Sequence, residues 1–136
     1  MTARRVLLVE DDRAIRVFVE ILLSTEPDLE LVGTAGSAER AIELVAELAP
    51  DLVLLDHQLD GPLTGVEAAP RLKVAAPGVL VLLCTALDLA GQAAAEPAID
   101  GYLRKDDLVD LLDVVRALLG GAAGPSGSPA GPAGSA

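Results

Sequence analysis

The sequence is poor in cysteine, in basic residues and in long apolar runs. A single cysteine, Cys84, rules out an intramolecular disulfide and favours a reducing compartment. Ten Lys and Arg stand against 21 Asp and Glu, a formal net charge of −11, and no segment forms the basic stripe that phosphate-backbone binding requires. No segment approaches the roughly 20 apolar residues of a membrane span, and the N-terminus lacks the apolar region of a signal peptide. These absences predict a cytoplasmic protein with no membrane insertion and no direct nucleic-acid binding.

The composition indicates one folded domain followed by a tail. A chain of 136 residues that is 51% hydrophobic is long enough for one sizeable core. From Gly120 onward the chain contains only Gly, Ala, Pro and Ser, which bury too little apolar surface to offset the entropy lost on ordering. We therefore expect a domain over residues 1–119 and a disordered tail over residues 120–136.

Short apolar runs alternate with segments in which apolar residues recur at helical spacing. The runs are bounded by turn or charged residues, which favours strands, most of them buried on both faces of a sheet. We expect strands over residues 6–9, 29–35, 51–56, 79–85 and 99–105. We expect helices over residues 12–25, 37–49, 65–75, 87–95 and 106–119, the fourth of them short. Pro70 falls inside the third, where proline costs about 3 kcal/mol, so that helix should be kinked or begin late.

Polar residues that can bind a ligand or take part in catalysis lie where the predicted strands end. Strands separated by helices run parallel, and right-handed crossovers place all their carboxyl ends on one edge of the sheet. In open α/β sheets this edge forms the crevice in which ligands bind. The residues at or just past the strand ends are Glu10, Asp11, Asp56, Thr85 and Lys105. The sequence predicts that these side chains meet in one crevice.

Three carboxylates in one crevice repel one another, and a hard divalent cation relieves the repulsion. Mg²⁺ prefers oxygen ligands and usually takes one or two carboxylates together with water and phosphate oxygens. Glu10, Asp11 and Asp56 meet this need, and a backbone carbonyl just beyond Asp56 would add a ligand. The Lys105 ammonium and the Thr85 hydroxyl complete a pocket suited to a phosphoryl group. A carboxylate nucleophile is already ionised at neutral pH, so phosphoryl transfer to it needs no general base.

Short motifs give residues 4–119 a family resemblance. They are Val-Glu-Asp at 9–11, Leu-Leu-Asp at 54–56, Cys-Thr-Ala at 84–86 and Gly-Tyr-Leu-Arg-Lys at 101–105. In this order they resemble the receiver domain of bacterial two-component response regulators, the CheY-like superfamily. The resemblance implies a flavodoxin-like, doubly wound, five-stranded parallel sheet of order 2-1-3-4-5 with five helices. It also implies a signalling protein that catalyses at most its own phosphorylation and dephosphorylation.

The resemblance assigns phosphorylation roles to individual residues. Asp56 is the phosphoacceptor, which attacks the phosphohistidine of a sensor histidine kinase or phosphotransfer protein. Thr85 and Lys105 bind phosphoryl oxygens, and Tyr102, one of only two aromatic residues, swings inward when Thr85 moves. The output face comprises the fourth helix, fifth strand and fifth helix. An unidentified downstream protein, or a second copy in a homodimer, would bind there.

The resemblance also assigns the ligands of the magnesium ion. Asp11 and Asp56 would bind Mg²⁺ directly, together with the backbone carbonyl of Gln58. Glu10 would act through a water molecule on the metal. The acidic residues would therefore divide between direct and water-mediated contact.

The sequence departs from the family pattern in two places. Asp60 stands four residues after Asp56, where family members commonly have proline, and the loop to Gly65 is one residue longer than usual. The stretch from Thr85 to Lys105 is about two residues short, roughly half a helical turn. This shortening falls on the fourth helix, which is part of the output face.

Several residues near the predicted crevice have plainer interpretations. Asp12 and Asp106 are placed to cap helices. Cys84 fits a small core residue, and His57 fits a bystander because strand neighbours point to opposite faces. Each acid alone could be a cap or a solvated strand end, so the prediction depends on their joint occurrence.

Two other functions remain open. A receiver-like scaffold could signal through protein binding without phosphorylation. An Mg²⁺-dependent phosphatase with an aspartyl nucleophile usually has a second acid two residues later, where this chain has Gln58. A receiver could also act alone or as part of a longer protein with a DNA-binding or catalytic region.

Overall fold

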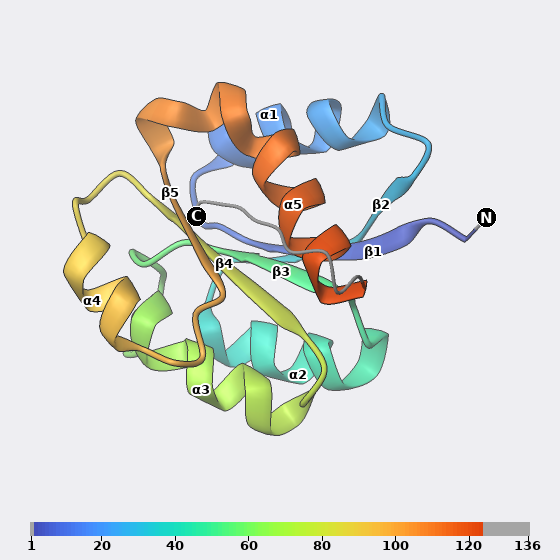
Figure 1. Ribbon diagram of the computed structural model, residues 1–136. Coiled ribbons are helices and arrows are strands. Elements are labelled where there is room, and N and C mark those ends of the chain that lie inside the picture. Colours follow the sequence, from blue (N-terminus) through green and yellow to red (C-terminus); the bar gives the residue numbers. More distant parts are fainter. Residues whose placement is uncertain (1, 124–136) are drawn as a thin grey trace.

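The computed structural model describes residues 2–123, which form a five-stranded parallel sheet and five α-helices (Figure 1). The strands are β1 (Arg4–Val9), β2 (Leu29–Ala35), β3 (Leu52–Leu55), β4 (Leu80–Thr85) and β5 (Gly101–Arg104). The helices are α1 (Arg13–Ser24), α2 (Ala38–Leu48), α3 (Gly65–Ala75), α4 (Ala90–Ala95) and α5 (Leu111–Ala123), and a 3₁₀ helix, η1 (Lys105–Asp110), precedes α5. The strand order is β2-β1-β3-β4-β5, which confirms the predicted flavodoxin-like sheet with a short fourth helix.

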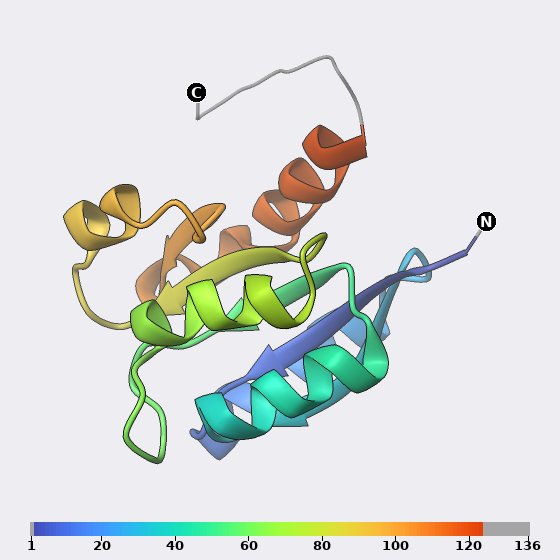
Figure 2. The same ribbon diagram turned by 90° about the horizontal axis from the view of Figure 1, so that it is seen from below.

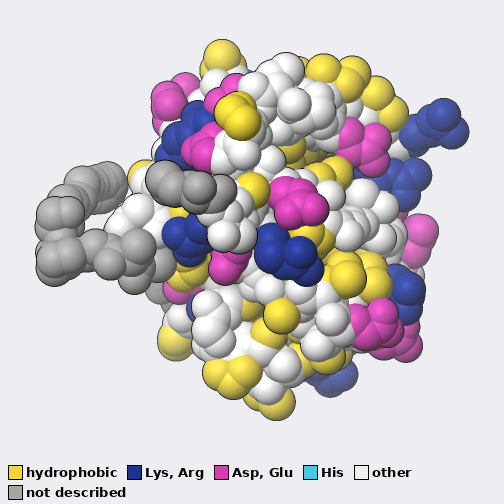
Figure 3. Space-filling model, turned by 90° about the vertical axis from the view of Figure 1, so that its right-hand side faces the viewer, with side chains coloured by type: hydrophobic (Ala, Val, Ile, Leu, Met, Phe, Trp, Pro, Cys, Tyr) yellow, Lys and Arg dark blue, Asp and Glu magenta, His cyan; other side chains and the backbone are white. Residues whose placement is uncertain are grey.

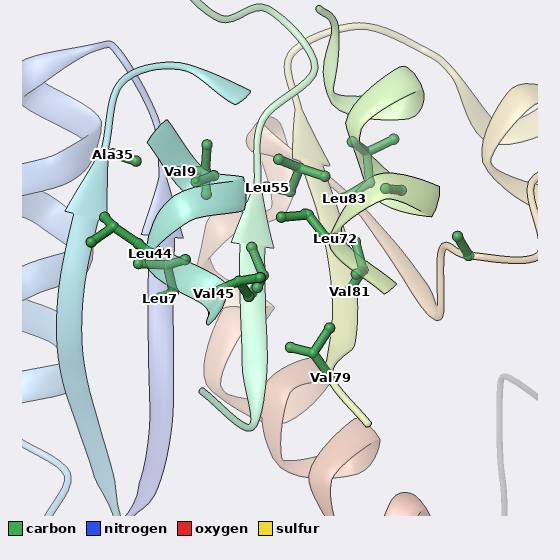
Figure 4. Close-up of a cluster of buried hydrophobic side chains, with 14 of the residues drawn as sticks. Leu7, Val9, Ala35, Leu44, Val45, Leu55, Leu72, Val79, Val81 and Leu83 are labelled. Carbon is green, nitrogen blue, oxygen red and sulfur yellow. The ribbon is translucent and has the colours of Figure 1, made fainter. Parts of the chain in front are cut away.

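Helices cover both faces of the sheet (Figures 1 and 2). Helices α1 and α5 lie on one face, and α2, α3 and α4 lie on the other. Alternate side chains of each strand enter opposite layers, so Val6 and Leu8 pack on the α1 side and Leu7 and Val9 on the α2 side. Figure 4 shows the α2 side, where Leu44 lies beside Leu7. Burial on both faces explains why the strands read as continuous apolar runs.

Polar side chains fix where α1 and α2 begin. The Asp12 carboxylate accepts a hydrogen bond from the Ile15 N–H at 3.1 Å, and the Ser37 hydroxyl accepts one from the Arg40 N–H at 3.2 Å. Each cap gives a partner to an N–H group that the first turn of a helix leaves free. The predicted capping role of Asp12 is confirmed, and α1 is thereby anchored directly after the acidic residues that follow β1.

Of the kink or late start expected for α3, the late start is wrong, because the helix begins at Gly65 and continues across Pro70. A capping box fixes this start: the Thr64 hydroxyl accepts from the Glu67 N–H, and the Glu67 carboxylate accepts from the Thr64 N–H. Pro70 is exposed on the helix surface. The helix therefore accommodates the ring on its solvent side and forgoes the one hydrogen bond that the missing N–H would have made.

The end of the domain also differs from the sequence expectation. Asp106 does not cap the last helix, because η1 begins at Lys105 and Asp106 lies within its first turn. Helix α5 then runs to Ala123, four residues past the expected end of the folded part. Residues 124–136, where most of the predicted disordered tail falls, lie outside the described residues, so that tail remains a prediction.

The surface carries charges of both signs. Figure 3 views the molecule from the right-hand side of Figure 1, and on this face basic and acidic side chains are interspersed with hydrophobic ones. No single-sign area dominates that face of the described residues. Within residues 2–123, none of the helices is both long enough and apolar enough to cross a bilayer.

Arg116 of α5 joins the last helix to the turn between α1 and β2. Its guanidinium donates to both carboxylate oxygens of Asp28, with Nε–Oδ2 at 3.2 Å and Nη2–Oδ1 at 3.0 Å, and it also donates to Glu26. These hydrogen bonds from Arg116 are the main reason that the pKa values of Glu26 and Asp28 are lowered. The contact is electrostatic and should depend on pH.

We predict that Arg116→Met lowers the melting temperature at pH 7 and that the loss shrinks in acid. A carboxylate whose pKa is depressed by folding adds stability above its unfolded pKa, about 4, and that stability is lost as the pH falls through the folded pKa. The loss at pH 7 should be small because the groups are exposed. Thermal unfolding followed by circular dichroism at neutral and acidic pH measures it. Equal differences between variant and wild type at both pH values would contradict the prediction.

Candidate functional site

The predicted site residues lie at the carboxyl ends of the central strands and of β5. Glu10 directly follows β1, Asp56 directly follows β3, Thr85 is the last residue of β4, and Lys105 directly follows β5. All four strands run parallel, so these ends share the left-hand edge of the sheet in Figure 1. Right-handed crossovers thus bring residues from four separate segments to one place.

Three acidic residues converge at this edge. Glu10, Asp11 and Asp56 each offer a carboxylate oxygen, and these oxygens all lie within 4.8 Å of one another. Glu10 is 2% exposed and Asp56 is 4% exposed, whereas Asp11 faces solvent. The cluster therefore consists of two buried acids with a third acid at the opening.

Lys105 is the counterion of the two buried acids. Its ammonium lies 2.8 Å from Glu10 Oε1 and 3.1 Å from Asp56 Oδ2. Backbone groups hold the other oxygens: the His57 N–H donates to Asp56 Oδ1 at 2.7 Å, and the Asp12 N–H donates to Glu10 Oε2 at 3.1 Å. Each buried carboxylate is thus hydrogen-bonded through both oxygens, which fixes its orientation.

Burial and hydrogen bonds shift the pKa values of Glu10 and Lys105. Burial raises the pKa of Glu10 to about 7, and the nearby charge of Asp56 adds to the rise, although hydrogen bonds from Lys105 and the Asp12 backbone oppose it. Burial would lower the pKa of Lys105, but its hydrogen bonds to Glu10 and Asp56 outweigh that effect and leave the pKa raised. Lys105 therefore stays charged at neutral pH, and one ammonium faces three carboxyl groups.

The donor set fits a hard divalent cation. Three carboxylate groups supply oxygen ligands within reach of one another, and Lys105 neutralises only one of the three charges. Mg²⁺ binds such oxygen-only sites and keeps its remaining positions for water or phosphate oxygens. The acidic cluster can therefore hold a metal ion at the exposed side, where Asp11 lies.

The other predicted site residues lie around this pocket without contacting the acids directly. Thr85 is fully buried, and its hydroxyl accepts a hydrogen bond from the Leu87 N–H at 3.2 Å. Tyr102 is half-buried, and its hydroxyl hydrogen-bonds the loop after Thr85 rather than the acids. Gln58 lies two residues past Asp56, in the loop between β3 and α3, with its side chain exposed.

Gly65 is a structural residue of the site that the sequence analysis did not identify. A β-carbon at this position would lie 2.2 Å from the Asp56 carbonyl oxygen and 2.8 Å from the His57 α-carbon. The Gly65 N–H donates to the His57 carbonyl at 2.9 Å. The first turn of α3 can therefore approach the Asp56 backbone only because residue 65 lacks a side chain. A glycine directly after the Thr64 cap was the available signal.

Two neighbours of the pocket have structural roles. The His57 ring accepts a hydrogen bond at Nδ1 from the Val66 N–H at 3.4 Å, so it supports the start of α3. Cys84 is buried, and burial raises the pKa of its thiol to about 12. It packs as a small core residue in the layer beneath α1 and α5.

Comparisons with known proteins agree with this geometry. The family model described as "Response regulator receiver domain" matches residues 6–116. "Response regulator protein VraR" of Staphylococcus aureus is 36% identical over 115 residues, which cover 82% of this chain and 54% of the relative. The chain thus spans about half the length of the curated relatives that it matches.

Solved structures share the fold. A two-component response regulator of the LuxR family from Aurantimonas sp. SI85-9A1 superposes with a TM-score of 0.80 at 28% identity, covering 88% of this chain and 87% of the other. The signal receiver domain of an HD domain-containing protein from Pseudomonas fluorescens Pf-5 gives a TM-score of 0.80 at 28% identity, with 90% and 91% covered. Both similarities extend over nearly all of the described residues.

We predict that Gly65→Ala destabilises the domain by about 1–3 kcal/mol, the usual cost of forcing an extra carbon into a packed site. The added methyl would push α3 or the Asp56 backbone away, because the contact is with main-chain atoms. Urea unfolding measures the change in the free energy of unfolding, provided that the m-value is the same in variant and wild type. Gly91→Ala in α4 is the matched control, since its β-carbon meets nothing within 4 Å. A loss of stability no larger in Gly65→Ala than in this control would contradict the prediction.

Proposed function

Because the chain belongs to the response regulator receiver domain family, we propose that Asp56 accepts a phosphoryl group from the phosphohistidine of a sensor histidine kinase or phosphotransfer protein. The main support is the pairing of Lys105 with the buried Asp56, beside Glu10 and Asp11. This arrangement gives a nucleophilic carboxylate a fixed orientation and a neighbouring cation. The exchange takes place in the cytoplasm and switches a signalling protein rather than turning over an external substrate.

Asp56 supplies the nucleophile of the transfer. One carboxylate oxygen attacks phosphorus while the phosphorus–nitrogen bond of the donor breaks, and the bonding electron pair leaves with the imidazole. The product is an acyl phosphate on Asp56. Lys105, now 3.1 Å from Asp56, binds a phosphoryl oxygen, and the Thr85 hydroxyl donates to another. A carboxylate nucleophile has no proton to lose on attack, so the transfer needs no general base.

The residues that would hold Mg²⁺ are the carboxylates of Asp11 and Asp56 and the backbone carbonyl of Gln58, with Glu10 acting through a metal-bound water. When bound, the ion offsets the negative charge that the carboxylates share with the incoming phosphoryl group. Asp56 keeps its oxygen directed toward the pocket through the His57 N–H. Hydrolysis of the acyl phosphate would reset the protein.

The output passes through protein contacts. The face formed by α4, β5 and α5 is the surface that a movement of Thr85 and Tyr102 would change, because Tyr102 lies on β5 and bonds the loop before α4. A downstream protein, or a second copy of this chain, would bind this face in the phosphorylated state. The matched segment is 54% of the length of the curated relative, so the output of a full-length protein includes whatever the remaining part contributes.

The phosphorylation test uses a small-molecule donor. Incubated with acetyl phosphate and Mg²⁺, the wild type should gain one phosphoryl mass by intact mass spectrometry, and Asp56→Asn should gain none. Lys105→Met should be modified at least tenfold more slowly, since loss of a charge-stabilising donor costs about 2 kcal/mol or more in the transition state. An unmodified wild type would favour the alternative of a scaffold that signals without phosphorylation.

A second prediction concerns the metal alone. At a Mg²⁺ concentration ten times the dissociation constant, linkage adds about 1.4 kcal/mol of stability, which raises the melting temperature by several degrees. Asp11→Asn and Asp56→Asn should abolish the shift. Asp60→Asn is the matched control, because Asp60 is an exposed acid of the neighbouring loop outside the cluster. An equal Mg²⁺ response in all four proteins would show that the ion does not bind at this pocket.

A further inference from the structure

The loop that joins β4 to α4 starts at Thr85 and lacks local support. Helix α4 has only six residues, and Leu89 at its N-cap position supplies no side-chain cap. Ala86, Leu87 and Asp88 are exposed, so little apolar burial holds the loop. Local hydrogen bonds to Thr85 and Asp88 are supplemented by hydrogen bonds from another element.

That element is β5, which contributes two side chains on the same face. Tyr102 and Arg104 are two residues apart on the strand and therefore point the same way. The Tyr102 hydroxyl donates to the Leu87 carbonyl at 2.9 Å and accepts from the Leu89 N–H at 2.8 Å. The Arg104 Nη2 donates to the Ala86 carbonyl at 3.2 Å. Together the two side chains bond the loop backbone at three residues, Ala86, Leu87 and Leu89.

The same loop is bonded to Thr85. In the β4–β5 ladder Arg104 is the direct partner of Thr85, so the two residues lie side by side at the end of the sheet. The Thr85 hydroxyl accepts from the Leu87 N–H at 3.2 Å. Any movement of Thr85 toward Asp56 must therefore break that bond or pull Leu87 along. Movement of Leu87 would strain the hydrogen bonds that Tyr102 and Arg104 make to the loop.

The Arg104 contact also carries a penalty that a loop movement could relieve. Its Nε is buried and has no hydrogen-bond partner among the described residues. An unpaired buried donor costs free energy, so this arrangement opposes release less strongly than a fully bonded guanidinium would. A contact of this kind holds the loop but can be released.

We infer that Arg104 is a positioning residue of the switch. Its hydrogen bond to Ala86 and those of Tyr102 to Leu87 and Leu89, together called the clasp, hold residues 86–89 in place. The clasp keeps the Thr85 hydroxyl bonded to the Leu87 N–H until Asp56 is phosphorylated. The hydrogen bonds of the clasp in the free protein do not depend on the proposed function. The release of the clasp on phosphorylation rests on the proposed function. Phosphorylation draws Thr85 away, the clasp opens, and the start of α4 changes with it.

Residue-resolved hydrogen exchange by NMR tests the clasp in the intact chain. In Arg104→Met the amides of Leu87 and Leu89 should exchange about three- to tenfold faster than in the wild type, as expected for one lost hydrogen bond. Arg104→Lys keeps a donor near the Ala86 carbonyl and should restore most of the protection. Arg71→Met, which removes an exposed arginine of α3, should leave these amides unchanged.

Phosphorylation provides the second readout. With acetyl phosphate and Mg²⁺ the exchange of the Leu87 amide should rise in the wild type, and the rise should be at least halved in Arg104→Met because the clasp is already open. Exchange within twofold of wild type in the free Arg104→Met protein would overturn the clasp. Faster exchange spread equally over β5 and α5 would overturn it too, since Arg104 would then stabilise the whole domain. A wild type that takes up no phosphoryl group would refute the proposed function, while the free-protein exchange still decides the clasp.

Discussion

Two buried carboxylates that share one ammonium are the interaction on which this site depends. Glu10 and Asp56 are almost completely buried, and Lys105 bonds both. Burying charged groups away from water costs free energy. A single cation cannot neutralise two neighbouring buried acids together with Asp11 at the opening. Burial is the main reason that the pKa of Glu10 is raised, and the neighbouring charge of Asp56 adds to the rise. The acidic pocket can therefore accept a metal ion, and the bond from Lys105 fixes the orientation of the Asp56 carboxylate.

The rest of the fold fixes the positions of the acids and of Lys105. Parallel strands buried on both faces fix the positions of the strand ends, and a rigid core tolerates the electrostatic cost at the edge. Gly65 lets α3 close against the Asp56 backbone, and Asp12 turns the chain into α1 directly beside Glu10. On the other side, Tyr102 and Arg104 connect the pocket to the short α4 through the loop after Thr85. Hydrogen bonds thus link β5 to the loop that precedes the short surface helix α4.

Much of this could be predicted because it depends on patterns that are local in the sequence. An acid directly after a buried apolar run identified Glu10 and Asp56, and a capping residue before helical spacing identified Asp12. The late start that Pro70 suggested for α3 was wrong, because the capping box that fixes the helix start outweighs one lost hydrogen bond on an exposed face. The contacts of Gly65 and Arg104 depend on distances between elements, and those distances are set by packing that a single sequence does not display.

The most direct test of the central claim is a crystal structure of the protein with Mg²⁺ and beryllium fluoride, a tetrahedral mimic of a phosphoryl group. We expect the fluoride complex bonded to a carboxylate oxygen of Asp56, with the Lys105 ammonium and the Thr85 hydroxyl on its fluorine atoms. The metal should be bound by Asp11 and Asp56. A complex in which Asp56 carries no beryllium, or in which Lys105 turns away from it, would contradict the account.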